Sequence, residues 1–281
     1  MARTIGARNL PKQEGSGTNS SAGDRVLLQA LAKGLAVFGL FDSLRPEWTV
    51  DEITEELGLP RMTVYRVVKT LESEGYLVGD PATNRYHLGP ALMAATHVTS
   101  LRWGELARLA RPYLEDLATR TRETVTLAIE VDGVAVEIDS IHTPRPFRRQ
   151  LAPGRVIGYE ASAHGKVFVA HMSPPERERV FAAPFHPPTS RAAADLESLS
   201  LKLDRIREDG VAYDFEERDL GTCAVAAPVR DQFGNVVASM GVLAPPGRFG
   251  PEQQQSHAEA VKAATQVFSA FLGYRAPEIG R

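Results

Sequence analysis

The chain has 281 residues, of which 43% are hydrophobic and 24% charged, and its formal net charge is −3. This balance is typical of a globular protein with material for two ordinary domains or one large one. No apolar run approaches the roughly 18–20 residues that cross a bilayer, and the N-terminus lacks the apolar segment of a secretory signal. The single cysteine, Cys223, excludes an internal disulfide and a cysteine-based metal cluster, so we expect a cytoplasmic protein that does not bind membranes.

The first predicted helix follows an N-terminal tail. Residues 1–23 are rich in Gly, Ser and Asn and lack periodicity, which predicts a disordered tail, and residues 276–281 form a second tail. From residue 25 onward, apolar residues recur at steps of three and four, which predicts a helix. We expect this helix to end near Arg45, because the residue before a proline such as Pro46 avoids helical backbone angles.

Two further helices are predicted around a three-residue turn. Thr49 with Glu52 three residues later predicts a capping box, and Gly58 predicts the end of that short helix. Pro60 then opens the next helix, where its missing N–H costs nothing. The buried stripe of this third helix is predicted to consist of Val64, Val67, Val68 and Leu71.

A hairpin is predicted directly after these helices. The segment YLVGDPATNRYHLG contains two short β-prone runs around a turn that includes Asn84 and Arg85. The order helix, short helix, turn, helix, hairpin predicts a winged helix-turn-helix over residues 24–89, with the hairpin as its wing.

The remainder of the chain predicts a second domain that mixes helices and strands. Residues 90–122 are mainly helical, and two strands over 125–141 flank a turn at Asp132 and Gly133. We predict further strands over 150–157, 223–230 and 235–243, and helices over 162–172, 174–182, 194–209 and 251–272. The fold class is therefore α+β, with a linker helix over 90–103 and a second domain over 104–275.

The third helix is the candidate DNA-reading element. A major groove admits one helix, and side chains near the helix N-terminus reach the base edges. Residues 24–90 carry seven basic and ten acidic side chains, so the total charge of this region opposes DNA binding whereas the placement of its cations favours it. The candidate DNA-binding residues are Thr49, Arg61, Met62, Thr63, Tyr65, Arg66, Lys69, Asn84 and Arg85.

Three other interpretations of the sequence compete with this one. The polar face of the third helix could be an ordinary solvated surface, although the ordered set of helices, turn and wing favours DNA. The helical domain could instead bind protein. An enzyme that uses Cys223 with a histidine is the third alternative, but the P-loop, G-x-S-x-G and H-E-x-x-H motifs are absent and the seven histidines lack metal-ligand spacing. We therefore expect no catalytic residue, no metal and no cofactor.

The stretch TVDEITEELGLPRMTVYRVVKTLESEGYLVGDPATNRYHLGPAL resembles the N-terminal domain of the isocitrate lyase regulator (IclR) family of bacterial transcription factors. The resemblance continues through ASAHGKVFVAHM, IREDGVAYDFEE and CAVAAPVRDQFGNVVASMGVLAPPGRF. It implies a winged helix-turn-helix, a linker helix and a GAF-like domain that binds a small effector. It also implies a transcriptional regulator, here expected to be a repressor, that binds palindromic double-stranded operators as a homodimer or a dimer of dimers. Many members have Lys-Ser-Thr where this chain has Arg61-Met62-Thr63, which should change the operator preference.

The resemblance also implies an effector site in the second domain. Hydroxyl-bearing serines that many members carry in the last strand fall on Gly241 and Leu243, and the segment before Cys223 is one residue shorter than usual. The lost hydroxyls and the gained room favour an aromatic or other medium-sized organic acid, whose carboxylate could pair with Arg149 or a protonated His164. Asp214 could instead only cap a turn. The candidate effector-binding residues are Phe147, Arg149, Leu151, Ala163, His164, Gly165, Asp214, Cys223, Gly241 and Leu243.

Overall fold

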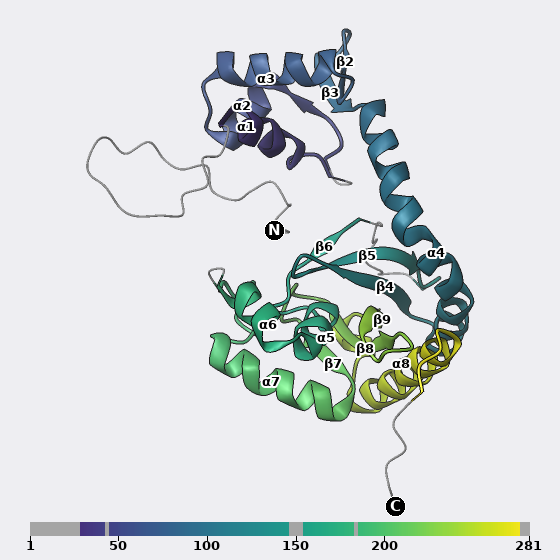
Figure 1. Cartoon of the computed structure of the whole chain (residues 1–281). Coiled ribbons are helices and arrows are strands. Elements are labelled where there is room, and N and C mark those ends of the chain that lie inside the picture. Colours follow the sequence, from purple (N-terminus) through teal and green to yellow (C-terminus); the bar gives the residue numbers. More distant parts are fainter. Residues whose placement is uncertain (1–28, 43–44, 146–153, 183–184, 276–281) are drawn as a thin grey trace, which may run out of the picture. The chain divides into compact units, whose positions relative to one another are not determined.

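A computed structural model of the chain describes residues 29–42, 45–145, 154–182 and 185–275, without the side chains of 96–102. The chain forms two compact units, Met1–Arg102 and Trp103–Arg281 (Figure 1). Each unit has its own hydrophobic core. Among the described residues, no helix combines the length and the apolar character that crossing a membrane requires.

The first helix, α1 (Gln29–Phe38), is shorter than predicted. It ends at Phe38, just before Gly39, and the N–H groups of Leu40 and Phe41 donate to carbonyls three residues earlier, which closes a tight turn. This turn brings Phe41 into the core with Val37 and Trp48. The prediction that the helix continues to Arg45 was therefore wrong, because burial of Phe41 and the glycine at position 39 favour an earlier end.

The next two helices agree with their predicted caps. β1 (Trp48–Thr49) leads into α2 (Val50–Leu57), where Thr49 and Glu52 form the capping box and Gly58 adopts φ 62° at the C-terminus. α3 (Arg61–Ser73) begins after Pro60, and its Val64 and Val68 are fully buried.

The predicted wing is confirmed. β2 (Leu77–Asp80) and β3 (Arg85–Leu88) pair antiparallel, and β1 adds a third strand in the order β1-β3-β2. The turn between β2 and β3 is closed by Asp80, whose carboxylate accepts from the Ala82 N–H and the Thr83 hydroxyl, both at 2.8 Å. Asn84 takes φ 55°, a left-handed conformation that asparagine tolerates better than most residues.

A single long helix, α4 (Pro90–Thr121), follows the wing. Its last turns belong to the second unit, where Ala110, Leu114 and Leu117 are fully buried. The helical character predicted for 90–122 is therefore confirmed.

The second unit is built on a six-stranded antiparallel sheet (Figure 1). The strands are β4 (Thr124–Val131), β5 (Val134–Ile141), β6 (Val156–Ile157), β7 (Ala212–Phe215), β8 (Cys223–Arg230) and β9 (Val236–Ala244), in the order β6-β5-β4-β9-β8-β7. Asp132 and Gly133 both have positive φ, as the predicted hairpin turn between β4 and β5 requires. Edge strand β7 was missed, because its four residues alternate too briefly to show a period.

Helices cover both faces of this sheet. The C-terminal part of α4 and α8 (Pro251–Phe271) pack on one face, and a short 3-10 turn η1 (Pro246–Arg248) precedes α8. α5 (Ala163–His171) and α7 (Leu196–Asp209) pack on the other face, next to α6 (Pro174–Phe181). The predicted α+β class, with an N-terminal winged helix-turn-helix and a C-terminal α/β domain, is confirmed.

Candidate nucleic-acid interface and small-molecule site

The exposed face of α3 carries most of the candidate DNA contacts. With Val64 and Val68 buried, the opposite side projects into solvent, where Met62 is 64% and Tyr65 is 41% exposed. Thr63 lies at the border of this face and is half-buried. The exposed members of the face are Arg61, Met62, Tyr65, Arg66 and Lys69.

Two of the three cations on this face are paired with carboxylates. The Arg61 Nε donates to Asp51 Oδ1 at 2.5 Å, and the Lys69 Nζ donates to Glu72 Oε2 at 2.7 Å. These hydrogen bonds raise the pKa of both cations. Arg66 forms no ion pair with any residue that the structure describes. The face therefore presents one unpaired cation and two partly neutralised ones.

Arg85 is directed toward α2 in the structure. Its guanidinium lies 3.4–3.5 Å from the Glu52 carboxylate and 3.5 Å from the Glu47 carbonyl. Glu52 also pairs with Arg45 at 2.8 Å, and the Thr49 N–H is the main reason that the pKa of Glu52 falls to about 2. The Thr49 hydroxyl is engaged by the same carboxylate. DNA contacts by Arg85 and Thr49 stay predictions. To contact DNA, each side chain would have to exchange its hydrogen bond with Glu52 for one with the DNA.

Among the described residues, the candidate effector residues other than Cys223 lie on one face of the sheet or on the helix that covers it. Paired residues on neighbouring strands point to the same side, and the register pairs Asp214 with Ala224, Ala224 with Leu243, and Ala226 with Gly241. The sheet face that these residues share is covered by α5. The structure therefore brings Asp214, Gly241 and Leu243 to the side where Ala163 and His164 lie.

The centre of this face is occupied by the His164 imidazole. Its Nε2 lies 2.7 Å from the Thr126 hydroxyl and its Nδ1 lies 2.9 Å from the Ser239 hydroxyl. A Cβ added to Gly241 would meet Nε2 at 2.8 Å, so glycine at 241 is what admits the ring. The room predicted beside Gly241 is therefore filled by His164, and that expectation was wrong.

The His164 imidazole is neutral. Burial lowers its pKa to about 3, and the charges of Arg218 and Arg155 lower it further. The prediction that a protonated His164 pairs with a carboxylate was wrong, because the ring is fully enclosed and faces two hydroxyls. Arg149, the other predicted partner, lies outside the described residues, as do Phe147 and Leu151.

A buried charged cluster lies beside His164, at the end of β7. The Lys166 Nζ donates to Glu217 Oε2 at 2.9 Å, and Lys166 is 1% exposed. Asp214 Oδ1 accepts from the N–H groups of Glu217 and Arg218 at 2.8 and 3.3 Å. Asp214 therefore caps the turn after β7, which was the alternative that the sequence left open.

Two arginines near this cluster were not predicted. Arg155 Nη2 donates to Asp219 Oδ2 at 3.2 Å, and Arg218 donates to the Val156 carbonyl at 3.4 Å and lies 3.8 Å from the same Asp219 oxygen. No local sequence motif indicates that Thr126, Ser239 or these arginines belong to the site. Strand alternation alone could have placed Thr126 on the face that α5 covers.

Cys223 faces away from this site. It packs in the cluster that α4 and α8 cover, whereas Ala224 and Ala226 point toward α5. Its predicted place in the effector site was wrong, because side chains alternate along β8 and the register assigns the even positions to the α5 side. Burial raises the pKa of the Cys223 thiol to about 11, which makes it a poor nucleophile.

Gly165, another candidate effector residue, allows α5 to pack closely against the chain before it. A Cβ added at this position would lie 2.4 Å from the Gly158 carbonyl oxygen.

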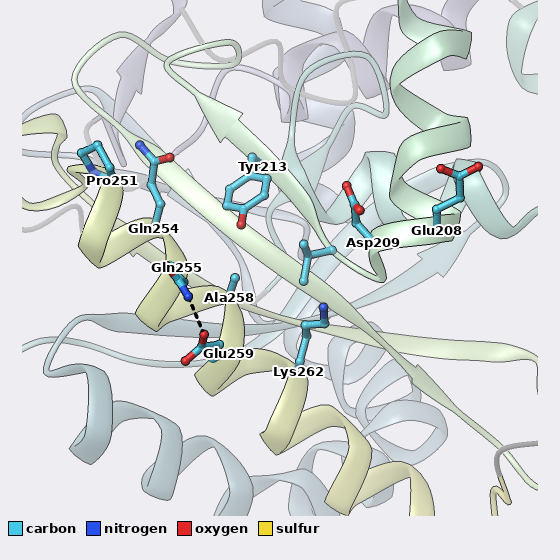
Figure 2. Close-up of a pocket in the computed structure, with 10 residues that line it drawn as sticks. Glu208, Asp209, Tyr213, Pro251, Gln254, Gln255, Ala258, Glu259 and Lys262 are labelled. Carbon is cyan, nitrogen blue, oxygen red and sulfur yellow. Dashed lines mark hydrogen bonds between the residues drawn. The ribbon is translucent and has the colours of Figure 1, made fainter. Parts of the chain in front are cut away.

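An open groove of about 570 Å³ lies on the side of the sheet that faces away from His164 (Figure 2). The end of α7, the strand β7 and the start of α8 line it. Its lining is mainly polar and includes Tyr213, Gln254 and a Gln255–Glu259 hydrogen bond of 3.0 Å. It is therefore separate from the site around His164. Within the described residues, no set of three or more His, Cys, Asp or Glu side chains is arranged to hold a metal ion.

Comparison with known families identifies the chain. The model described as bacterial transcriptional regulator IclR C-terminal matches residues 98–270, and the IclR helix-turn-helix domain matches residues 30–81. The chain belongs to the IclR family. It is a DNA-binding transcriptional regulator, and the families and relatives that it matches are regulators rather than enzymes.

Individual IclR-family relatives support this assignment. The HTH-type transcriptional regulator Rv1719 of Mycobacterium tuberculosis is 34% identical over 198 residues, which cover 70% of this chain and 75% of that protein. The HTH-type transcriptional regulator KdgR of Escherichia coli is 29% identical over 246 residues, 85% of this chain and 92% of that protein. The DNA-binding transcriptional repressor YiaJ of E. coli is 26% identical over 250 residues, 88% of each chain.

Solved IclR-family structures share the fold. A regulator from Alicyclobacillus acidocaldarius aligns with a TM-score of 0.69 and 26% identity over 88% of this chain and 100% of that one. An IclR homologue from Microbacterium hydrocarbonoxydans, crystallised with 4-hydroxybenzoate, aligns with a TM-score of 0.68 and 22% identity over 86% of this chain and 98% of that one.

Replacement of Asp214 by asparagine is expected to change how stability depends on pH. Burial raises the pKa of Asp214 from 3.8 to about 6, so between these values the folded protein holds the proton more tightly than the unfolded chain. The contribution of Asp214 to wild-type stability therefore falls by about 2–3 kcal/mol as pH rises through this window. The side chain introduced by Asp214→Asn would not titrate, and its carbonyl oxygen can still accept from the Glu217 N–H.

Urea unfolding of both proteins from pH 4 to pH 7 measures this difference. The stability of Asp214→Asn relative to the wild type should rise with pH. The depressed pKa of His164 gives the opposite slope, but it is present in both proteins and cancels in the comparison. A difference that stays constant over this range would contradict the assigned environment of Asp214.

Proposed function

We propose that this IclR-family regulator inserts α3 into the major groove of a palindromic operator, as a homodimer or a dimer of dimers, and represses transcription. The observation that carries the proposal is the exposed α3 face, with Arg61, Tyr65 and Arg66 opposite the buried Val64 and Val68. The name of the E. coli repressor YiaJ supports repression. The winged helix-turn-helix extends over 24–89, the linker helix over 90–103 and the GAF-like effector domain over 104–275.

We propose further that a small organic acid binds on the α5 side of the sheet. Because His164 is neutral and fills the space beside Gly241, the carboxylate would be recognised by Arg155 and Arg218, whose charges reach the imidazole. An aromatic acid is favoured because a homologue of similar fold was crystallised with 4-hydroxybenzoate.

Effector binding would control DNA binding through linkage. The two recognition helices of a dimer must lie about 34 Å apart to enter successive major grooves. A ligand that favours one arrangement of the linker helix changes this spacing, and a coupling of about 1–3 kcal/mol changes operator affinity by roughly 5- to 150-fold.

Electrophoretic mobility shift with DNA from upstream of the protein's own coding sequence tests this function. We expect the protein to retard this DNA. 4-Hydroxybenzoate or benzoate should release the DNA from the protein, whereas glyoxylate should leave it bound. Absence of any retarded band in low salt, at micromolar protein, would contradict the DNA-binding proposal. Release by glyoxylate alone would contradict only the proposed effector class.

A further inference from the structure

Asp51, an acidic residue of α2, contacts Arg61, the first residue of α3. Arg61 Nε donates to Asp51 Oδ1 at 2.5 Å, although the two side chains are 62% and 71% exposed. Exposed ion pairs of this kind contribute little to folding stability. We therefore consider the role of this pair in the binding of DNA by the surface.

The contact uses one particular edge of the guanidinium. An arginine carries five N–H donors in a rigid plane, and the bond to Asp51 engages the Nε edge. The edge formed by the two Nη groups stays available, and it can donate two parallel hydrogen bonds to O6 and N7 of guanine. Asp51 thus holds the Arg61 plane in one orientation without occupying the edge that reads a base.

The same carboxylate also affects binding to DNA of any sequence. Binding without sequence preference comes mainly from cations that neutralise phosphates and release counterions. Asp51 places a negative charge beside Arg61 and so weakens its attraction to phosphates. Such an effect lowers the affinity for random DNA, whereas orientation of the guanidinium raises the affinity for a site with guanine in the right place.

We propose that Asp51 is a positioning residue that sets operator specificity, by orienting Arg61 toward a guanine and by reducing its attraction to the phosphate backbone. This inference rests on the proposed docking of α3 in the major groove. It predicts effects of opposite sign on operator DNA and on random DNA when the carboxylate is removed.

The full-length Asp51→Asn protein tests the inference, with two DNA probes. One probe is a duplex that the wild-type protein enriches from a randomised pool, and the other is a random duplex of the same length. Asp51→Asn should bind the enriched duplex about 3- to 10-fold more weakly and the random duplex about 2- to 5-fold more tightly. Repeated enrichment with the variant should show a reduced preference for guanine at one position in each half-site.

Glu55→Gln is the matched control, because Glu55 is an exposed carboxylate of the same helix with no ion pair among the described residues. Equal effects of Asp51→Asn and Glu55→Gln would overturn the proposal, since loss of charge alone would then explain both. In an Arg61→Ala background, Asp51→Asn should leave the base preference unchanged, and a further change there would also overturn it. Circular dichroism melting checks that α2 is intact.

These outcomes separate the inference from the function on which it rests. A wild-type protein that enriches no duplex would refute recognition by α3 itself. Enrichment by the wild type that Asp51→Asn reproduces with the same guanine preference would refute only the role of Asp51.

Discussion

Simultaneous replacement of Arg61, Arg66 and Arg85 by alanine is expected to weaken operator binding by about 100- to 10,000-fold. Arg61 and Arg66 project from the exposed face of α3, and Arg85 begins the second strand of the wing. The slope of log affinity against log salt should also fall by roughly one for each phosphate that these arginines no longer neutralise. Fluorescence anisotropy with a labelled enriched duplex, repeated at several salt concentrations, measures both quantities.

A second variant shows whether the loss of affinity depends on position or only on total charge. Arg179 and Arg205 are exposed residues of α6 and α7 in the other unit. Their joint replacement by alanine removes two positive charges far along the chain from the proposed interface. Operator affinity of this control should stay within about threefold of the wild type. A triple variant that binds as well as the control would contradict the assignment of the interface to α3 and the wing. Because Arg85 pairs with Glu52, the melting temperature of the triple variant must also be measured.

The DNA-binding unit could be predicted closely because its signals are local. The reciprocal bonds between Thr49 and Glu52, and the left-handed backbone of Gly58, lie within a few residues of one another. Such caps depend on side chains that a short sequence contains. The end of α1 was wrong for the opposite reason: burial of Phe41 beside Trp48, seven residues further on, decides it.

The candidate small-molecule site could be predicted only in part because its contacts are long-range. The bonds of His164 to Thr126 and Ser239 join residues 38 and 75 positions apart, and no local pattern indicates them. Sequence alone indicates that position 241 lacks a hydroxyl, but not that an imidazole occupies the space beside it. Cys223 was misplaced because one residue of register reverses the face to which a strand side chain points.

The buried salt bridge between Lys166 and Glu217 leads to the second large effect. Lys166→Met is expected to lower the free energy of unfolding by about 3 kcal/mol, because the buried Glu217 carboxyl group would lose its closest partner. Lys166 is 1% exposed, and its Nζ lies 2.9 Å from Glu217 Oε2. Lys202 lies 3.0 Å from the same oxygen but is 40% exposed, so solvent screens its contribution. Urea unfolding of the full-length protein at pH 7 measures the change.

Lys202→Met is the matched control, since it removes an ammonium at nearly the same distance from the same oxygen. Its expected cost is below about 1 kcal/mol, because exposed ion pairs contribute little. The double variant Lys166→Met/Glu217→Met removes both buried charges and should recover most of the lost stability. Equal costs for Lys166→Met and Lys202→Met would show that burial does not set the strength of this pair.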